Sequence, residues 1–220
     1  MSQNQDKNNL GLFAAVFAAF FGILFGINKL ASKKQNQPSS DKPDNGMTIA
    51  DFKSHVKNVV IDIQKAMDKI QPFLNLEDVY KKGKEIENSI SDFQVFLKNK
   101  IYDTEAIWKV FADLEMKIGS ITWGFSTSEP GLVQQIREEI SKLNNFANAF
   151  KSLLVTRGQV LRQVRDIYNG KNKREETRQH ETDQLKTLMK LFQNDIDRAT
   201  KEAAILQDVI TSISNKFGIR

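Results

Sequence analysis

The chain contains no cysteine, and this absence excludes disulfide bonds, thiolate catalysis and cysteine metal sites. Only two histidines occur, and His180 does not begin an HExxH motif because the residue four positions further on is Gln184. A glycine-rich phosphate loop, a GxSxG elbow and the Glu-x-x-His pattern of di-iron bundles are also missing from the sequence. These absences predict a protein that is not an enzyme and that has no catalytic residues, no metal site and no other cofactor.

Proline is scarce as well, and no strong excess of one charge is present. The 220 residues include 4 prolines, and each stands between stretches of helical pattern. The 32 lysines and arginines oppose 27 acids, which gives a net charge of +5, and the two signs interleave along the chain. Interleaved charge is typical of solvated helix faces and argues against a nucleic-acid partner. No small-molecule substrate is evident, whereas the mild positive charge favours approach to anionic lipid headgroups.

Long apolar runs are missing except for one near the start. Residues 10–27 read LGLFAAVFAAFFGILFGI, without charge or proline, and Leu30 and Ala31 extend the run. As a helix this run is roughly 27 Å long, which is near the thickness of a bilayer core. The sequence therefore predicts a short tail over residues 1–9 and a transmembrane anchor over residues 10–31. A cleaved signal peptide and a buried core helix are the alternatives, and the long apolar run and the polar segment after it disfavour both.

The cations around this run predict its orientation. Lys7 stands alone before the run, whereas Lys29, Lys33, Lys34 and Lys42 follow it. By the positive-inside rule, the chain is a single-pass membrane protein whose C-terminal part lies in the cytoplasm.

A stripe of small residues recurs at every fourth position inside the predicted anchor. Its members are Ala14, Ala18, Gly22 and Gly26. Small residues at this spacing let two helix backbones approach closely in lipid, so the stripe is a candidate packing surface between anchors.

Residues 32–47 are polar, contain two prolines and lack apolar periodicity, which predicts a flexible linker. Residues 48–220 then show apolar residues in steps of three and four, the pattern of a heptad-based helical domain. A capping box at Thr48 and Asp51 should open the first helix, and Pro72 should end it.

The apolar stripes predict about five long helices. Their expected extents are 49–70, 76–101, 104–125 after a cap at Asp103 and Thr104, about 130–169, and a last helix whose stripe covers 188–217. The fold class is therefore all-α, with one transmembrane helix followed by an elongated antiparallel bundle. The heptads could also pair between chains. We expect Trp108 and Trp123 to pack within the bundle.

A basic group surrounds the predicted turn between the last two helices. Its members are Arg157, Arg162, Arg165, Lys171, Lys173, Arg174 and Arg178. Such a group is a candidate contact for anionic lipid or an acidic partner, although many soluble helical hairpins end in similar charges. Arg157 falls on a seam position where the pattern would place an apolar residue, beside Gly158.

Two functions fit these features. The leading hypothesis is a membrane-tethered helical bundle that acts as a scaffold, tether or component of a membrane complex, with the lipid bilayer and proteins, including copies of itself, as partners. The alternative is a membrane-inserting protein, either pore-forming or membrane-remodelling, whose apolar helix enters the bilayer. The combination of a long bundle with one apolar segment resembles the architecture of α-helical pore-forming cytolysins.

Overall fold

The structure, a computed structural model, describes residues 48–85, 90–169 and 174–218, and this part of the chain forms helices and their connections without a strand. Its elements are α2 (Ile49–Ile70), the 3-10 helix η1 (Gln71–Phe73), α3 (Glu77–Glu85), α4 (Ile90–Phe125), α5 (Pro130–Gln135), α6 (Arg137–Asn169) and α7 (Glu175–Phe217). The all-α prediction is confirmed for the bundle. The predicted tail, anchor and linker over residues 1–47 lie outside the described residues.

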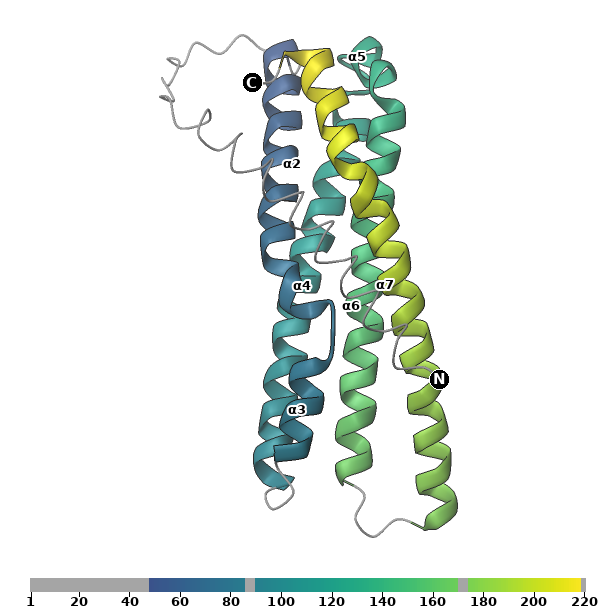
Figure 1. The fold of residues 1–220 in the computed structure, drawn as a ribbon. Helices are drawn as coiled ribbons and strands as arrows, with labels where there is room; N and C mark the ends of the chain where they lie inside the picture. The colour runs from purple at the N-terminus through teal and green to yellow at the C-terminus, as the bar shows by residue number, and fades with distance from the viewer. Residues whose placement is uncertain (1–47, 86–89, 170–173, 219–220) are drawn as a thin grey trace.

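Four lengths of chain run antiparallel along a rod (Figure 1). α2, η1 and α3 together run from one end to the other, α4 returns, α6 runs down again and α7 returns. α6 packs between α4 and α7, and α2 packs on α4. We call the end where Thr48 begins the linker end; it also holds α5 and the ends of α4 and α7. The opposite end, the distal end, holds the start of α4, the end of α6 and the start of α7.

The first helix begins and ends as the sequence predicts. The backbone N–H of Thr48 donates to the Asp51 carboxylate at 2.8 Å, and the Asp51 N–H donates to the Thr48 hydroxyl at 3.2 Å. This reciprocal capping box satisfies two donors that a helix start leaves free. α2 ends at Ile70, and η1 with Pro72 follows.

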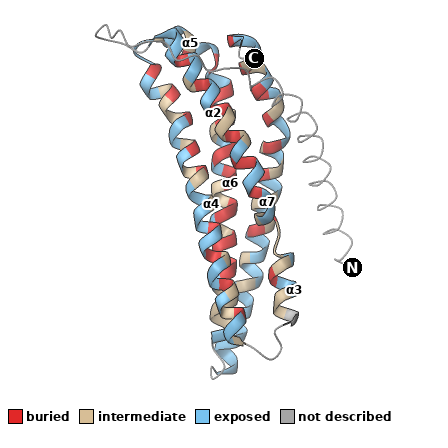
Figure 2. Ribbon diagram, turned by 90° about the vertical axis from the view of Figure 1, so that its left-hand side faces the viewer, coloured by how far each residue is buried: buried red, intermediate tan, exposed pale blue. Residues whose placement is uncertain are grey.

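The apolar faces of α2, α4, α6 and α7 meet in one core. At the linker end the ring of Phe52 meets those of Phe125 and Phe217 edge-on, with centroids 5.0 and 5.4 Å apart. Midway along the rod, the rings of Phe111 and Phe150 stack at 5.1 Å. The buried positions form inward stripes on each helix (Figure 2), as the steps of three and four predict. The expectation that Trp123 packs in the bundle is wrong, because its side chain is 84% exposed.

A second, smaller cluster holds the distal end together. The buried residues of this cluster are Val79, Phe93, Leu97, Ile101 and Leu161. The ring of Phe93 also lies edge-on to that of Tyr168, at 4.8 Å. α7 adds no buried residue here, since the first buried position in α7 is Phe192. Residues 175–191 of α7 are therefore held by fewer apolar contacts than the rest of the bundle.

The helix cap predicted at Asp103 and Thr104 is wrong, because α4 runs through it without a break. The Thr104 side chain is buried, and its hydroxyl donates to the carbonyl of Lys100 at 2.7 Å. Threonine makes this bond inside a helix, whereas at a cap its oxygen accepts a bond. The predicted second helix over 76–101 is divided instead, with α3 covering its first part and α4 its second.

The predicted helix over 130–169 contains a break at Ile136, between α5 and α6. Ile136 has φ −119° and ψ 17°, outside the helical region. The ammonium of Lys216, near the end of α7, donates to the carbonyl of Gln135 at 2.9 Å. A side chain from a distant segment thus supplies a donor to a carbonyl at the break. The sequence around Ile136 does not predict this contact.

Candidate interaction surfaces

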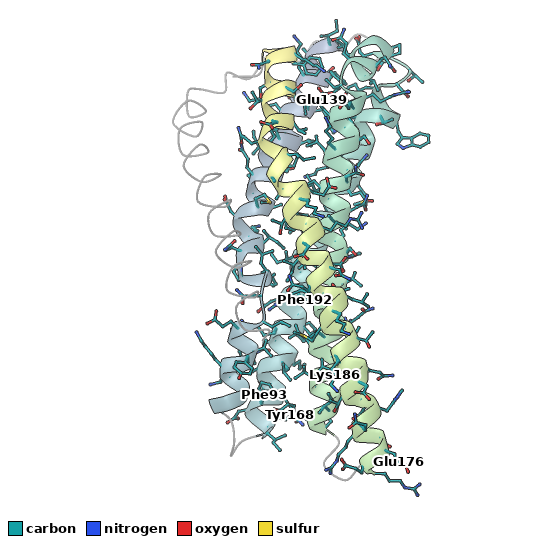
Figure 3. All side chains as sticks on the ribbon, turned by 45° about the vertical axis from the view of Figure 1, so that its right-hand side comes forward. Phe93, Glu139, Tyr168, Glu176, Lys186 and Phe192 are labelled. Atoms are coloured by element: carbon teal, nitrogen blue, oxygen red, sulfur yellow. The ribbon has the colours of Figure 1, made fainter. Side chains whose placement is uncertain are left out.

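The predicted basic group lies at the distal end. Arg162 and Arg165 stand on the last turns of α6, and Arg174 and Arg178 stand at the start of α7. The two lysines of the group, Lys171 and Lys173, lie outside the described residues. Figure 3 places Glu176, beside this group, at the far end of the rod from Glu139.

Acids of the same chain already contact part of this group. The Arg162 guanidinium donates to the Glu105 carboxylate of α4 at 2.7 Å, and Arg165 donates to Asp166 at 3.1 Å. The four side chains of these two pairs are between 38% and 50% exposed. Ion pairs so open to water contribute only about 0–1 kcal/mol, so a partner's carboxylates can replace these acids at small cost.

A groove between α4 and α6 lies beside these arginines. Its volume is about 460 Å³, and its lining residues are Ser91, Gln94, Val95, Lys98, Ile101, Tyr102, Glu105, Arg162, Arg165 and Asn169. The lining carries three cations and one acid, and the amide of Gln94 bridges the groove to Asn169 at 2.5 Å. The guanidinium groups of Arg162 and Arg165 can exchange these weak internal pairs for other carboxylates.

Arg157 does not belong to this surface, because its side chain is 1% exposed. Its guanidinium donates to the backbone carbonyls of Phe73, at 3.4 Å, and of Asn75, and it lies 5.5 Å from the centroid of the Phe73 ring. These carbonyls belong to the break between α2 and α3, so Arg157 anchors that break to α6. Burial lowers the pKa of Arg157 to about 10, against the opposing charge of Asp78, and the side chain stays cationic at neutral pH. The prediction that Arg157 contacts lipid or a partner is therefore wrong.

The first histidine lies beside a hydroxyl. His55 Nε2 of α2 is 2.7 Å from the Ser120 hydroxyl of α4 and 3.2 Å from the Lys117 carbonyl. The ring also packs 5.5 Å from that of Phe125. In the described part of the chain no carboxylate hydrogen-bonds to His55, so the pair lacks the third group that orients a catalytic base. The contact joins α2 to α4.

The second histidine stands on the exposed part of α7, where His180 Nε2 lies 3.0 Å from the Gln184 amide nitrogen. Within residues 48–85, 90–169 and 174–218, no three histidine or acidic side chains are placed to hold a metal ion.

Sequence reasoning missed a buried carboxylate at the linker end. Glu139 of α6 is 7% exposed and accepts hydrogen bonds from the Ser212 hydroxyl and the Lys216 ammonium, each at 2.6 Å. Burial raises the pKa of Glu139, but the hydrogen bonds from Lys216 and Ser212 outweigh it and leave the pKa lowered. The sequence pattern shows only that an acid stands next to the apolar stripe of α6. It does not show the partners of that acid, because Ser212 and Lys216 both come from α7.

No helix within the described ranges is long and apolar enough to cross a bilayer. The predicted anchor and its stripe of Ala14, Ala18, Gly22 and Gly26 lie outside those ranges. Comparisons with protein-family models, with curated proteins and with solved structures found no match to this chain.

Proposed function

We propose that this chain is a non-enzymatic, membrane-tethered helical bundle that acts as a scaffold or tether in a membrane complex. One observation carries the proposal: residues 10–27 are an uncharged apolar run, and the apolar faces of α2, α4, α6 and α7 pack against one another in one core. An uncharged helix that is apolar on every side needs an apolar solvent. The bilayer supplies that solvent for residues 10–31.

The structure also supports different roles for the two ends of the rod, with membrane attachment at the linker end and partner binding at the distal end. The linker joins at Thr48, whereas the basic group lies at the other end of α4. At 1.5 Å per residue, the 36 residues of α4 separate the ends by about 54 Å. The linker attaches at the opposite end of the rod, so we propose an acidic protein segment as the partner of Arg162, Arg165, Arg174 and Arg178.

Membrane extraction of the full chain tests the tether. Phe17→Lys with Phe21→Lys places two charges in the middle of the apolar run, where each costs about 2.5–3.5 kcal/mol of insertion free energy. The unchanged chain should stay with membranes through an alkaline wash, and this double variant should be released in a helical form. A matched control, Val155→Lys with Ile205→Lys, adds the same charges at exposed bundle positions and should stay with the membranes.

The same material distinguishes the alternative function. A full chain that is soluble and monodisperse without detergent, and that then lyses liposomes, would contradict the permanent tether and favour a membrane-inserting protein. The proposed orientation places residues 48–220 on the cytoplasmic face of the membrane. In inverted bacterial membrane vesicles, where that face points outward, added protease should therefore digest the bundle.

A further inference from the structure

Exposed apolar side chains follow a straight line along the outer side of α4. Val95, Tyr102, Met116 and Trp123 are 56%, 59%, 65% and 84% exposed. They stand seven or fourteen positions apart, and Lys109 occupies the remaining position of the series. Residues seven apart lie on one side of a helix, so these five residues form a line about 42 Å long, which we call the outer seam.

The outer seam faces away from the core. The buried residues Leu97, Phe111, Ile118 and Phe125 each lie two positions after a residue of the seam series, or nearly opposite on the helix. Single exposed apolar residues are ordinary on a protein surface, whereas four of them on one line with heptad spacing are typical of a helix face that packs against another helix.

A glycine inside this face points to a close neighbour. Gly119 lies between Met116 and Trp123, inside the last two turns of α4, where glycine weakens a helix relative to alanine. A Cβ added at Gly119 would meet no atom within 4 Å, so packing inside the described bundle does not require glycine there. The missing side chain leaves a recess into which a side chain or backbone of another helix fits.

The charges on the same face suit a second copy of this chain. Among the described residues, neither Lys109 nor Asp113 forms an ion pair, although both are exposed. Glu105 and Asp113 flank Lys109 at four positions on either side. In a parallel, in-register pair of helices, Lys109 faces Lys109 of the other copy, and Asp113 and Glu105, which also pairs with Arg162, stand one turn away on either side. The acids of each copy then offset the repulsion between the two lysines.

We propose that the outer seam pairs with the outer seam of a second copy, with the two α4 helices parallel and in register. The parallel direction rests on the proposed function, because two copies tethered to one membrane extend from it in the same direction. Each apolar residue of the seam then meets its own counterpart, and Gly119 lets the two backbones approach. The axis of this two-fold pair runs along the membrane normal.

Disulfide trapping tests this pairing. The chain contains no cysteine, so in a single-cysteine variant the introduced thiol can form a disulfide only with another copy. Two cysteines bridge only when their Cα atoms lie within about 7 Å, which a parallel pair allows between identical positions on the seam. Full-length Met116→Cys in membranes should form disulfide-linked dimers under copper–phenanthroline. Lys201→Cys, exposed on α7, is the matched control and should form at least tenfold fewer.

Gly119→Leu, added to Met116→Cys, separates pairing from folding. Leucine should abolish the disulfide dimer, while the thermal midpoint stays the same or rises, because the space around Gly119 is open and leucine favours the helix. Equal dimer yields from Met116→Cys and Lys201→Cys would overturn the proposal. So would an unchanged yield in Gly119→Leu, or trapping of Tyr102→Cys with Met116→Cys in place of identical positions, which marks an antiparallel pair.

Failure of this inference is distinguishable from failure of the tether. Membranes that hold the chain through the alkaline wash but give no dimer at position 116 overturn the pairing alone. Release of the chain by the wash overturns the tether, and trapping of the released chain then decides the pairing in solution.

Discussion

At the scale of single residues, Arg157 and Glu139 are two buried charges whose partners come from distant segments. Arg157 supplies donors to carbonyls at the break between α2 and α3, and Glu139 accepts bonds from α7. A buried charge is tolerated when hydrogen bonds compensate its lost hydration. Arg157 therefore supplies donors to backbone carbonyls that have no partner within their own helix, whereas Glu139 joins α6 to α7 through side chains.

Replacement of Arg157 tests this role. Arg157→Leu removes the donors to the carbonyls of Phe73 and Asn75 and should lower the free energy of unfolding by about 1–3 kcal/mol. Hydrogen exchange of α3 should quicken in the same variant. Arg162→Leu is the matched control, because Arg162 is exposed and its pair with Glu105 is worth less than about 1 kcal/mol. Equal losses in the two variants, measured by urea unfolding, would contradict the anchoring role of Arg157.

The lowered pKa of Glu139 predicts a pH dependence of stability. A carboxyl whose pKa is lower in the folded than in the unfolded chain stabilises the fold above its ordinary pKa, and this contribution is lost as pH falls through the folded value. Glu139→Gln should cost about 1–2 kcal/mol at pH 7 and should lose less stability than the unchanged chain between pH 7 and pH 3. The exposed neighbour Glu138→Gln should leave the acid limb unchanged. An equal loss of unfolding free energy between pH 7 and pH 3 in Glu139→Gln and in the unchanged chain would rule out this linkage.

At the scale of helices, two threonines that were both predicted to cap a helix play opposite parts. Thr48 is a true N-cap whose oxygen accepts the Asp51 N–H, whereas the Thr104 hydroxyl donates within an unbroken helix. Thr48→Val should therefore cost about 1 kcal/mol of unfolding free energy. Thr104→Val should change it by less than about 0.5 kcal/mol, because the Lys100 carbonyl keeps its backbone partner in α4. Thermal unfolding followed by circular dichroism compares the two, and a larger loss at Thr104 would contradict a continuous α4.

The helical stripes were predictable because they depend on period alone, whereas helix ends depend on competition between local and distant contacts. The pattern from Phe93 through Phe125 continues in steps of three and four across Thr104, and burial of that face outweighs the preference of threonine for a cap. The break at Ile136 depends on Lys216, and no signal near Ile136 identifies a donor so far along the chain.

At the scale of the whole molecule, composition predicted the basic distal end but not which arginines reach its surface. Arg157 and Arg162 look alike in sequence. In the folded chain, however, Arg157 is buried, whereas the side chain of Arg162 is partly exposed. The outer seam was not predicted, because the sequence pattern was read only for the residues of the core stripe. Its position became visible once the opposite side of α4 proved to be the buried one.

The rod as a whole should loosen toward its distal end. In α7, residues 175–191 include no buried side chain, whereas the stretch from Phe192 to Phe217 includes eight, counting both ends. Local opening needs little free energy where few apolar contacts must break, so amides of residues 179–190 should exchange at least tenfold faster than those of residues 196–213. Mass-spectrometric hydrogen exchange on the full chain measures both ranges in one sample.

This gradient bears on the proposed partner at the distal end. An acidic segment that binds across Arg174 and Arg178 orders the start of α7, so its addition should slow exchange there and leave residues 196–213 unchanged. Exchange that is equally slow in both ranges before any partner is added would contradict the open distal end. It would mean that a segment outside the described residues, or another copy of the chain, already covers the first turns of α7.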